Sequence, residues 1–273
     1  MSDVAIRPLK GHDELQACVA LQHETWGREF TELAPPSLLY AVQKVGGVAA
    51  GAFDSSGRLL GFVFGFTGVL GGRLVHWSDM VAVRADAQGK WIGQALKAYQ
   101  RETVARLGVT AIWWTYDPLV SKNAHLNFNR YGVEVVEYVQ DLYGPDTRSV
   151  LHRGLGTDRF VVAWPIGPER AARRGGAPSD VPVEVRNADV VNTGTVEGRE
   201  SAPERFAAAR PRLLRVEIPR DIAAVQSTSL ELAGRWRATT RRAFQWCLAN
   251  GYAITGFYGD ASADRGYYVL ARP

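Results

Sequence analysis

The chain has 273 residues, 46% hydrophobic and 22% charged, so it can bury a sizeable core and has the composition of a globular protein. A formal net charge of +4 is too small to predict nucleic-acid binding, and two cysteines, Cys18 and Cys247, exclude a disulfide framework and favour the cytoplasm. The sequence has no apolar signal segment and no run near the ~18 apolar residues of a membrane span, so we expect no membrane association.

Hydrophobic periodicity predicts an α+β domain over residues 1–166. A short strand and two helices come first, followed by a meander of three strands. A glycine loop then leads into a helix whose apolar stripe includes Ile92 and Leu96. A strand, a short helix ended by Gly132 and two further strands complete the domain. The predicted strands lie at residues 5–8, 48–54, 59–68, 73–83, 109–118, 133–144 and 159–166.

The composition changes after this domain. Residues 167–211 are rich in Gly, Pro, Ala, Arg and Glu, with few large apolar side chains, which is typical of a linker or arm. Residues 212–273 then predict a strand, a long helix and two strands, a small C-terminal αββ extension. A piece this small needs a partner surface. We expect it to pack on the first domain or on a partner subunit, which makes a homodimer an expectation.

The segment from Gln88 to Gly93, QGKWIG, is a glycine loop that opens a helix. Unpaired N–H groups and the helix dipole favour an anion at such a helix N-terminus. The loop is not a P-loop, because no Ser or Thr follows Lys90, and it does not follow the first strand of a βαβ unit. The alternative is a plain connection between a strand and a helix.

With this element order, the chain resembles the GNAT N-acyltransferase superfamily over about residues 3–166. The phosphate-loop pattern of that superfamily, Q/R-x-x-G-x-G/A, matches at Gln88 and Gly93, whereas Trp91 replaces the middle glycine. A narrower branch with the motif WTxDPLxxxNAxxN and a C-terminal extension is similar at more positions. These are Trp114, Thr115, Asp117, Pro118, Leu119, Asn123, Ala124, Asn127 and Gly132, with Glu217–Pro219, Trp236–Arg237 and Gly251–Tyr252 in the extension.

The resemblance implies a mixed, mostly antiparallel sheet flanked by helices, with an acyl-CoA such as acetyl-CoA as donor substrate. It implies that the N–H groups of Val81 and Val83 pair with pantetheine, and that an N–H near Met80 polarises the thioester carbonyl. The pyrophosphate would lie on the loop, and Asn123 and Asn127 belong to the same cofactor-binding set. The loop residues expected to contribute are Gln88, Gly89, Lys90, Trp91, Ile92 and Gly93.

Trp91 is the main departure from that pattern. Its side chain either points away and covers the adenine side, with the backbone in an αR-type conformation that a non-glycine residue tolerates, or it fills the phosphate site. A second departure is Phe128, which stands where the superfamily has a tyrosine acid. The proton for the CoA thiolate would then come from water or from the amine.

The catalytic candidates are Asp79, Ser78 and Asp117. Strand alternation predicts His76, Ser78 and Met80 on one face and Asp79 on the other. Asp79 stands where the branch has a histidine base, and its alternative is a solvated or salt-bridged aspartate. His76 is a second candidate base or a structural core histidine. Asp117 ends a strand on the acyl side, or only forms the turn before a proline.

The helix that contains GRWRATTRRAFQW carries four arginines, Arg235, Arg237, Arg241 and Arg242, which could face an acyl carboxylate or the CoA phosphates. A bidentate arginine would favour a succinyl-like acyl group, and Arg237 is the one to test. The alternative is a solvated basic face. These expectations together predict an N-acyltransferase that moves an acetyl or succinyl-like group to the amine of a small molecule, such as an amino acid, without a metal. Two alternatives stay open: a non-catalytic ligand-binding protein with an altered CoA loop, and a protein lysine acetyltransferase.

Overall fold

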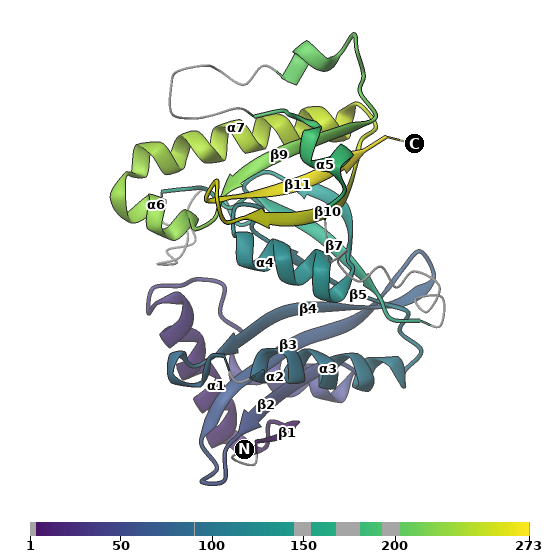
Figure 1. Ribbon diagram of the computed structural model, residues 1–273. Coiled ribbons are helices and arrows are strands. Elements are labelled where there is room, and N and C mark those ends of the chain that lie inside the picture. Colours follow the sequence, from purple (N-terminus) through teal and green to yellow (C-terminus); the bar gives the residue numbers. More distant parts are fainter. Residues whose placement is uncertain (1–3, 90, 145–153, 168–180, 193–202, 273) are drawn as a thin grey trace. The chain divides into compact units, whose positions relative to one another are not determined.

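The computed structural model describes residues 4–89, 91–144, 154–167, 181–192 and 203–272 (Figure 1). It divides into two compact units, and strands β5 and β7 each run from one unit into the other. The first unit holds the described residues up to Trp114 together with those from 164 to 167. The remaining described residues belong to the second unit.

The first unit is built on the larger sheet, whose strand order is β1-β2-β3-β4-β5-β7-β6. Strands β1 to β4 are antiparallel, whereas β4 and β5 are parallel. The strands are β1 (Ala5–Pro8), β2 (Val48–Phe53), β3 (Leu59–Leu70), β4 (Arg73–Val83) and β5 (Ala111–Tyr116). The helices are α1 (Gly11–Trp26), α2 (Pro36–Lys44), the 3-10 turn η1 (Ala85–Ala87) and α3 (Ile92–Ala105).

Side chains from both faces of this sheet are buried under helices. Phe62 and Phe64 of β3 join residues of α1 and α2 in one apolar cluster. The opposite face carries α3, whose Leu96 lies beside Gly61. Because both faces are covered, β2 and the first half of β3 are continuously apolar rather than alternating.

The second unit holds β6 and most of β7, at one end of the larger sheet, and a second sheet with the order β10-β11-β9-β8. Its strands are β6 (Glu134–Val139), β7 (Arg159–Pro165), β8 (Asp189–Val190), β9 (Leu213–Pro219), β10 (Ala253–Asp260) and β11 (Arg265–Ala271). Its helical segments are α4 (Ser121–His125), the π-helical η2 (Leu126–Tyr131), α5 (Val183–Asn187), η4 (Pro203–Phe206), α6 (Ile222–Thr228) and α7 (Leu230–Ala249).

An aromatic cluster forms the core of the second unit. Phe160 of β7, Phe244 of α7 and Tyr268 of β11 pack edge to face, with ring centroids 4.8 to 5.6 Å apart. The buried Tyr268 hydroxyl donates to the Pro118 carbonyl at 2.8 Å, so its polar atom is satisfied. The C-terminal elements and the segment after β5 therefore share one core within this unit.

The fold is α+β as predicted, with a mixed, mostly antiparallel sheet flanked by helices and an additional C-terminal sheet. The element order up to β7 is the one that the resemblance implied. Part of the predicted arm is structured: β8 pairs in parallel with β9, and the Asn192 side chain bonds both backbone groups of Glu217 at 2.7 and 2.8 Å. The limits proposed at residues 166 and 211 stay predictions.

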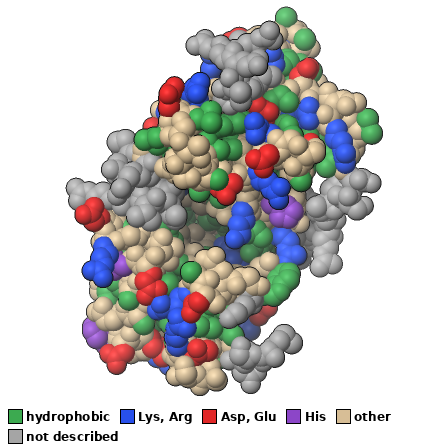
Figure 2. Space-filling model, turned by 60° about the vertical axis from the view of Figure 1, so that its left-hand side comes forward, with side chains coloured by type: hydrophobic (Ala, Val, Ile, Leu, Met, Phe, Trp, Pro, Cys, Tyr) green, Lys and Arg blue, Asp and Glu red, His purple; other side chains and the backbone are tan. Residues whose placement is uncertain are grey.

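None of the described helices is long and apolar enough to cross a membrane. On the face of the molecule drawn in Figure 2, basic and acidic side chains are interspersed rather than gathered by sign.

Candidate functional site

Strand β4 has an edge that its parallel neighbour β5 covers only in part. Pairing between the two strands is confined to His76 with Ile112 and Trp77 with Trp113. Towards its C-terminal end β4 continues to Val83, and here it is paired with β3. Val81 and Val83, the residues expected to bind pantetheine, lie in this stretch and are half-buried.

A β-bulge at Asp79 interrupts the ladder between β3 and β4. Ser78 pairs with Gly65 and Met80 pairs with Phe64, so Asp79 has no opposite residue. A bulge of this kind changes which face the following side chains occupy. Ser78 contacts α3, whereas Met80 packs with Phe64 among the residues of α1 and α2. The prediction that Met80 shares a face with His76 and Ser78 is therefore wrong.

The bulge presents the Asp79 carboxyl at the surface, where the side chain is exposed. Partial desolvation by neighbouring groups raises the pKa of Asp79, the negative charge of Glu32 adds to this effect, and a hydrogen bond from Trp77 opposes it. A carboxylate with a raised pKa is better matched to accepting a proton near neutral pH. Its role as a base stays a prediction.

Behind β4, on the side of α3, lies a buried polar cluster centred on Lys97. The Lys97 Nζ donates to Ser78 Oγ at 2.9 Å and to Gln100 Oε1 at 3.2 Å, and it lies 4.1 Å from the Trp114 ring centroid. Lys97 and Ser78 are 6% and 4% exposed. Desolvation by this burial lowers the pKa of Lys97 to about 7.

The cluster continues through Gln100 to His76. Because the Gln100 oxygen accepts from Lys97, the NH2 group of Gln100 faces His76 Nε2, 3.0 Å away, and donates to it. The proton of the His76 ring therefore lies on Nδ1, which is 3.0 Å from Thr67 Oγ1. Thr67 in turn donates to the Gly46 carbonyl at 2.7 Å. Desolvation, followed by the charge of Lys97, lowers the pKa of His76 to about 4. Of its two predicted roles, the structure gives His76 the environment of a core histidine.

The loop after β4 also departs from expectation. Trp91 is the N-cap of α3 with φ of 62° and ψ of 4°, the left-handed conformation, so the predicted αR-type backbone is wrong. Its side chain is 65% exposed. Gly89 has φ of 79°, and Gln88 Nε2 donates to the Val83 carbonyl at 3.3 Å. Lys90 lies outside the described residues.

The other two loop residues have different local roles. Ile92 is 3% exposed, so its side chain belongs to the core rather than to a ligand surface. A Cβ at Gly93 would lie 3.7 Å from Val83, an ordinary contact, so the space around this residue does not require glycine. Their predicted contribution to pyrophosphate binding would therefore come from backbone N–H groups.

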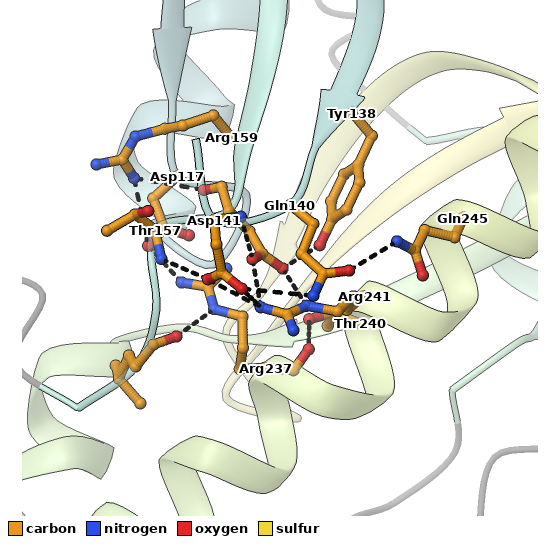
Figure 3. Close-up of polar contacts among 12 residues, drawn as sticks. Asp117, Tyr138, Gln140, Asp141, Thr157, Arg159, Arg237, Thr240, Arg241 and Gln245 are labelled. Atoms are coloured by element: carbon orange, nitrogen blue, oxygen red, sulfur yellow. Dashed lines mark hydrogen bonds and ion pairs between the residues drawn. The ribbon is translucent and has the colours of Figure 1, made fainter. Parts of the chain in front are cut away.

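In the second unit, residues from the two sequence motifs meet in a buried ion pair (Figure 3). Arg237 donates to Asp117 Oδ2 at 2.5 Å and to the Leu155 carbonyl at 2.9 Å, and Arg159 lies 3.7 Å from the same carboxylate. Asp117 Oδ1 accepts from the Leu119 N–H at 2.8 Å, as a turn-forming aspartate does. Arg237 is 5% exposed, so the alternative of a solvated basic face is wrong for this residue.

A second charged group in the same unit escaped sequence analysis. Arg241 donates to Asp158 at 2.5 and 2.8 Å and to Asp141 at 3.1 Å, while Tyr138 donates to Asp158. The Arg241 and Tyr138 donors help to hold the pKa of Asp158 below its usual value, against the raising effect of desolvation. The arginines of α7 could signal ion pairs, but the sequence does not reveal which carboxylates they meet.

The remaining candidates follow β5. Asn123 on α4 is exposed, whereas Asn127 on η2 is 4% exposed and its backbone carbonyl accepts from the Val133 N–H at 3.1 Å. Phe128 is buried against Tyr268, with ring centroids 5.9 Å apart. Phe128 therefore offers no proton and fills apolar space. The cofactor role of the two asparagines stays a prediction.

No protein-family model matches the chain, and no curated protein matches it. Similar solved structures include the ribosomal-protein-S18-alanine N-acetyltransferase from Escherichia coli, at 17% identity and a TM-score of 0.47, over 60% of this chain and 95% of that one. An aminoglycoside 6'-acetyltransferase type Ii has 19% identity and a TM-score of 0.46, over 60% and 98% of the two chains. An aminoglycoside 6'-N-acetyltransferase complexed with coenzyme A has 16% identity and a TM-score of 0.44, over 61% and 98%. These three similarities do not establish what the chain does.

Proposed function

We propose that the chain is an acyl-CoA-dependent N-acyltransferase that moves an acetyl or succinyl-like group to the amine of a small molecule, such as an amino acid. The observation that carries this proposal is the edge of β4. Its pairing with β5 ends at Trp77, a bulge follows at Asp79, and after the strand the turn η1 and the glycine loop precede the N-terminus of α3. Strand N–H groups can hold an extended pantetheine arm, and a helix N-terminus favours its pyrophosphate.

In the proposed reaction the amine nitrogen attacks the thioester carbonyl, the C–N bond forms and the C–S bond breaks. Backbone N–H groups of β4 near Met80 stabilise the charge that develops on the carbonyl oxygen. Asp79 accepts the proton that the amine loses, directly or through a water molecule. The raised pKa of Asp79 supports this assignment.

The test measures binding of CoA, acetyl-CoA and succinyl-CoA by calorimetry, and release of CoA thiol in the presence of a panel of amino acids and other amines. We expect binding in the micromolar range and turnover with at least one amine. Two variants separate the bulge from its carboxylate. Asp79→Asn keeps the bulge, so we expect normal binding and a loss of turnover of about 100-fold. Deletion of Asp79 restores a regular ladder, so we expect both binding and turnover to fall. An absence of acyl-CoA binding by the wild-type chain would refute the proposal.

A second candidate, a ligand-binding protein without catalysis, is favoured by the burial of Phe128 at the position of the family acid. It predicts acyl-CoA binding without thiol release by any amine of the panel, which the same experiment detects.

A further inference from the structure

Lys97 is a buried cation that no carboxylate neutralises among the described residues. Its Nζ has three neighbours able to accept: the Ser78 hydroxyl, the Gln100 amide oxygen and the face of the Trp114 ring. These three satisfy the geometry of an ammonium group, but they supply no negative charge. A buried charge without a counter-ion lowers stability, so its presence calls for a further reason.

The position of Lys97 supplies such a reason. The last paired residues of β4 and β5 are Trp77 and Trp113, and the next residues along the two strands are Ser78 and Trp114. Lys97 touches both of these, and all three residues lie within the first unit. The ammonium group therefore lies behind the point where the two strands stop pairing, directly before the bulge at Asp79.

The hydrogen bonds around Lys97 have a fixed direction. Gln100 is held with its oxygen towards Lys97, because its NH2 group faces His76, which is fixed by Thr67. Ser78 Oγ accepts a hydrogen bond from Lys97, and its own hydroxyl proton has no hydrogen-bond acceptor among the described residues. Ser78 is thus polarised by a cation, and its own hydroxyl proton is available for donation.

We infer that Ser78 and Lys97 form the proton-donating pair of the transfer reaction, with Ser78 as the group that protonates the departing CoA sulfur and Lys97 as its positioning partner. This inference rests on the proposed function. As the C–S bond breaks, its electron pair goes to sulfur, which takes the Ser78 proton. Ser78 Oγ regains a proton from Lys97 Nζ, and the neutral amine of Lys97 later recovers one from solvent. The proton lost by the acceptor amine leaves through Asp79.

The surroundings of Lys97 agree with this role. The groups that face it are Ser78 and His76 from β4, Gln100 from α3 and Trp114 from β5. Of these, only His76 has a side chain that commonly changes charge, and its lowered pKa of about 4 keeps it neutral at physiological pH. Lys97, with a pKa of about 7, can both give and recover a proton near neutral pH. Phe128, which is buried at the position of the usual tyrosine acid, has no proton to donate.

The test compares wild type with Lys97→Met and Ser78→Ala, and uses Lys44→Met, an exposed lysine of α2, as the matched control. For the first two variants we expect kcat to fall at least tenfold while acetyl-CoA affinity stays within about threefold. Because the acid form of Lys97 is required, the wild-type kcat should fall as pH rises above about 7, and Lys97→Met should lack this limb. Lys44→Met should match the wild type.

A second measurement does not depend on turnover. The ultraviolet absorbance of the thiolate reports the pKa of the CoA thiol when CoA is bound. A thiolate formed close to Lys97 stabilises its ammonium form, so this coupling should lower the pKa of the bound thiol in the wild type, and Lys97→Met should return it towards the value of free CoA. Equal thiol pKa values and equal pH profiles in both proteins, with turnover intact, would overturn this inference alone. A wild-type chain that does not bind acyl-CoA would overturn the proposed function and this inference with it.

Discussion

Trp91 holds its backbone at φ of 62° and ψ of 4°, a conformation that costs an L-residue roughly 1–2 kcal/mol. Trp91→Gly removes this cost. It also raises the conformational entropy of the unfolded chain, which lowers the free energy of unfolding by about 0.4–1 kcal/mol. We therefore expect its free energy of unfolding to stay within about 1 kcal/mol of the wild type. Trp91→Val, a β-branched residue at positive φ, should be about 1–2 kcal/mol less stable than Trp91→Gly. Urea unfolding measures both, and equal stability of the two variants would contradict the left-handed conformation.

Lys97 should make stability depend on pH. Its pKa is about 7 in the folded chain and 10.5 without burial, so between these values the unfolded chain binds more protons. The unfolding free energy should therefore rise with pH from 7 upward, by at most about 1.4 kcal/mol per pH unit. Below pH 7 the chain carries the full loss of stability that comes from burying a charged Lys97. Lys97→Met should abolish this rise. The comparison ends near pH 9, because above this pH a second group contributes to the pH dependence. Burial raises the pKa of the Cys18 thiol from 9.0 to about 12, so Cys18 ionises in the unfolded chain before it does so in the folded chain.

Parallel pH curves for the wild type and Lys97→Met would show that Lys97 is not the group responsible. Lys44→Met, which removes an exposed charge, should reproduce the wild-type curve.

At the level of elements, the Asp117–Arg237 pair joins the end of β5 to α7 within the second unit. Arg237→Met leaves the Asp117 carboxylate buried without this partner, and we expect a loss of about 3–5 kcal/mol of stability. Adding Asp117→Asn should recover a large part of this loss. Urea unfolding of the two single variants and the double variant measures the coupling. Additive losses would contradict a direct interaction.

The exposed pair of Arg242 with Glu204, at 2.9 Å, provides the control for this cycle. Arg242→Met should leave the unfolding curve unchanged, because solvent screens exposed ion pairs.

Periodicity predicted the elements well but not the bulge in β4. The alternation of His76, Ser78 and Met80 is regular in the sequence, and nothing in it marks Asp79 as the inserted residue. Similarly, Lys97 and Gln100 are buried on α3 together with Leu96. Because both side chains are polar, apolar periodicity does not identify them as buried. Both features depend on partners far along the chain, so local pattern could not identify them.

At the scale of the whole molecule, the C-terminal segment completes a core rather than forming a separate domain. Phe160 packs on Phe244 and Tyr268, both of which come from beyond residue 212. A fragment of residues 1–211 would expose Phe160 and the apolar residues near it. We expect this fragment to lack a cooperative thermal transition by circular dichroism, whereas the full chain has one. A cooperative transition in the fragment would show that residues 1–211 contain a part that folds without the C-terminal segment.

The arm shows how composition can mislead at this scale. Residues 167–211 are poor in large apolar side chains, yet Val191 is completely buried and Asn192 bonds the backbone of β9. A strand of two residues, Asp189–Val190, is too short for a period of two to be recognised. The expectation of a homodimer stays a prediction.

The contact between Lys97 and Trp114 has an optical consequence. A positive charge 4.1 Å from the ring centroid perturbs the excited state of an indole, and the perturbation disappears when the lysine loses its proton. Trp114 is also buried, at 8% exposure, so solvent has little access to it. The wavelength of the Trp114 fluorescence emission should therefore shift as Lys97 titrates. In a variant that retains only Trp114 of the eight tryptophans, this shift would report the charge of Lys97 directly.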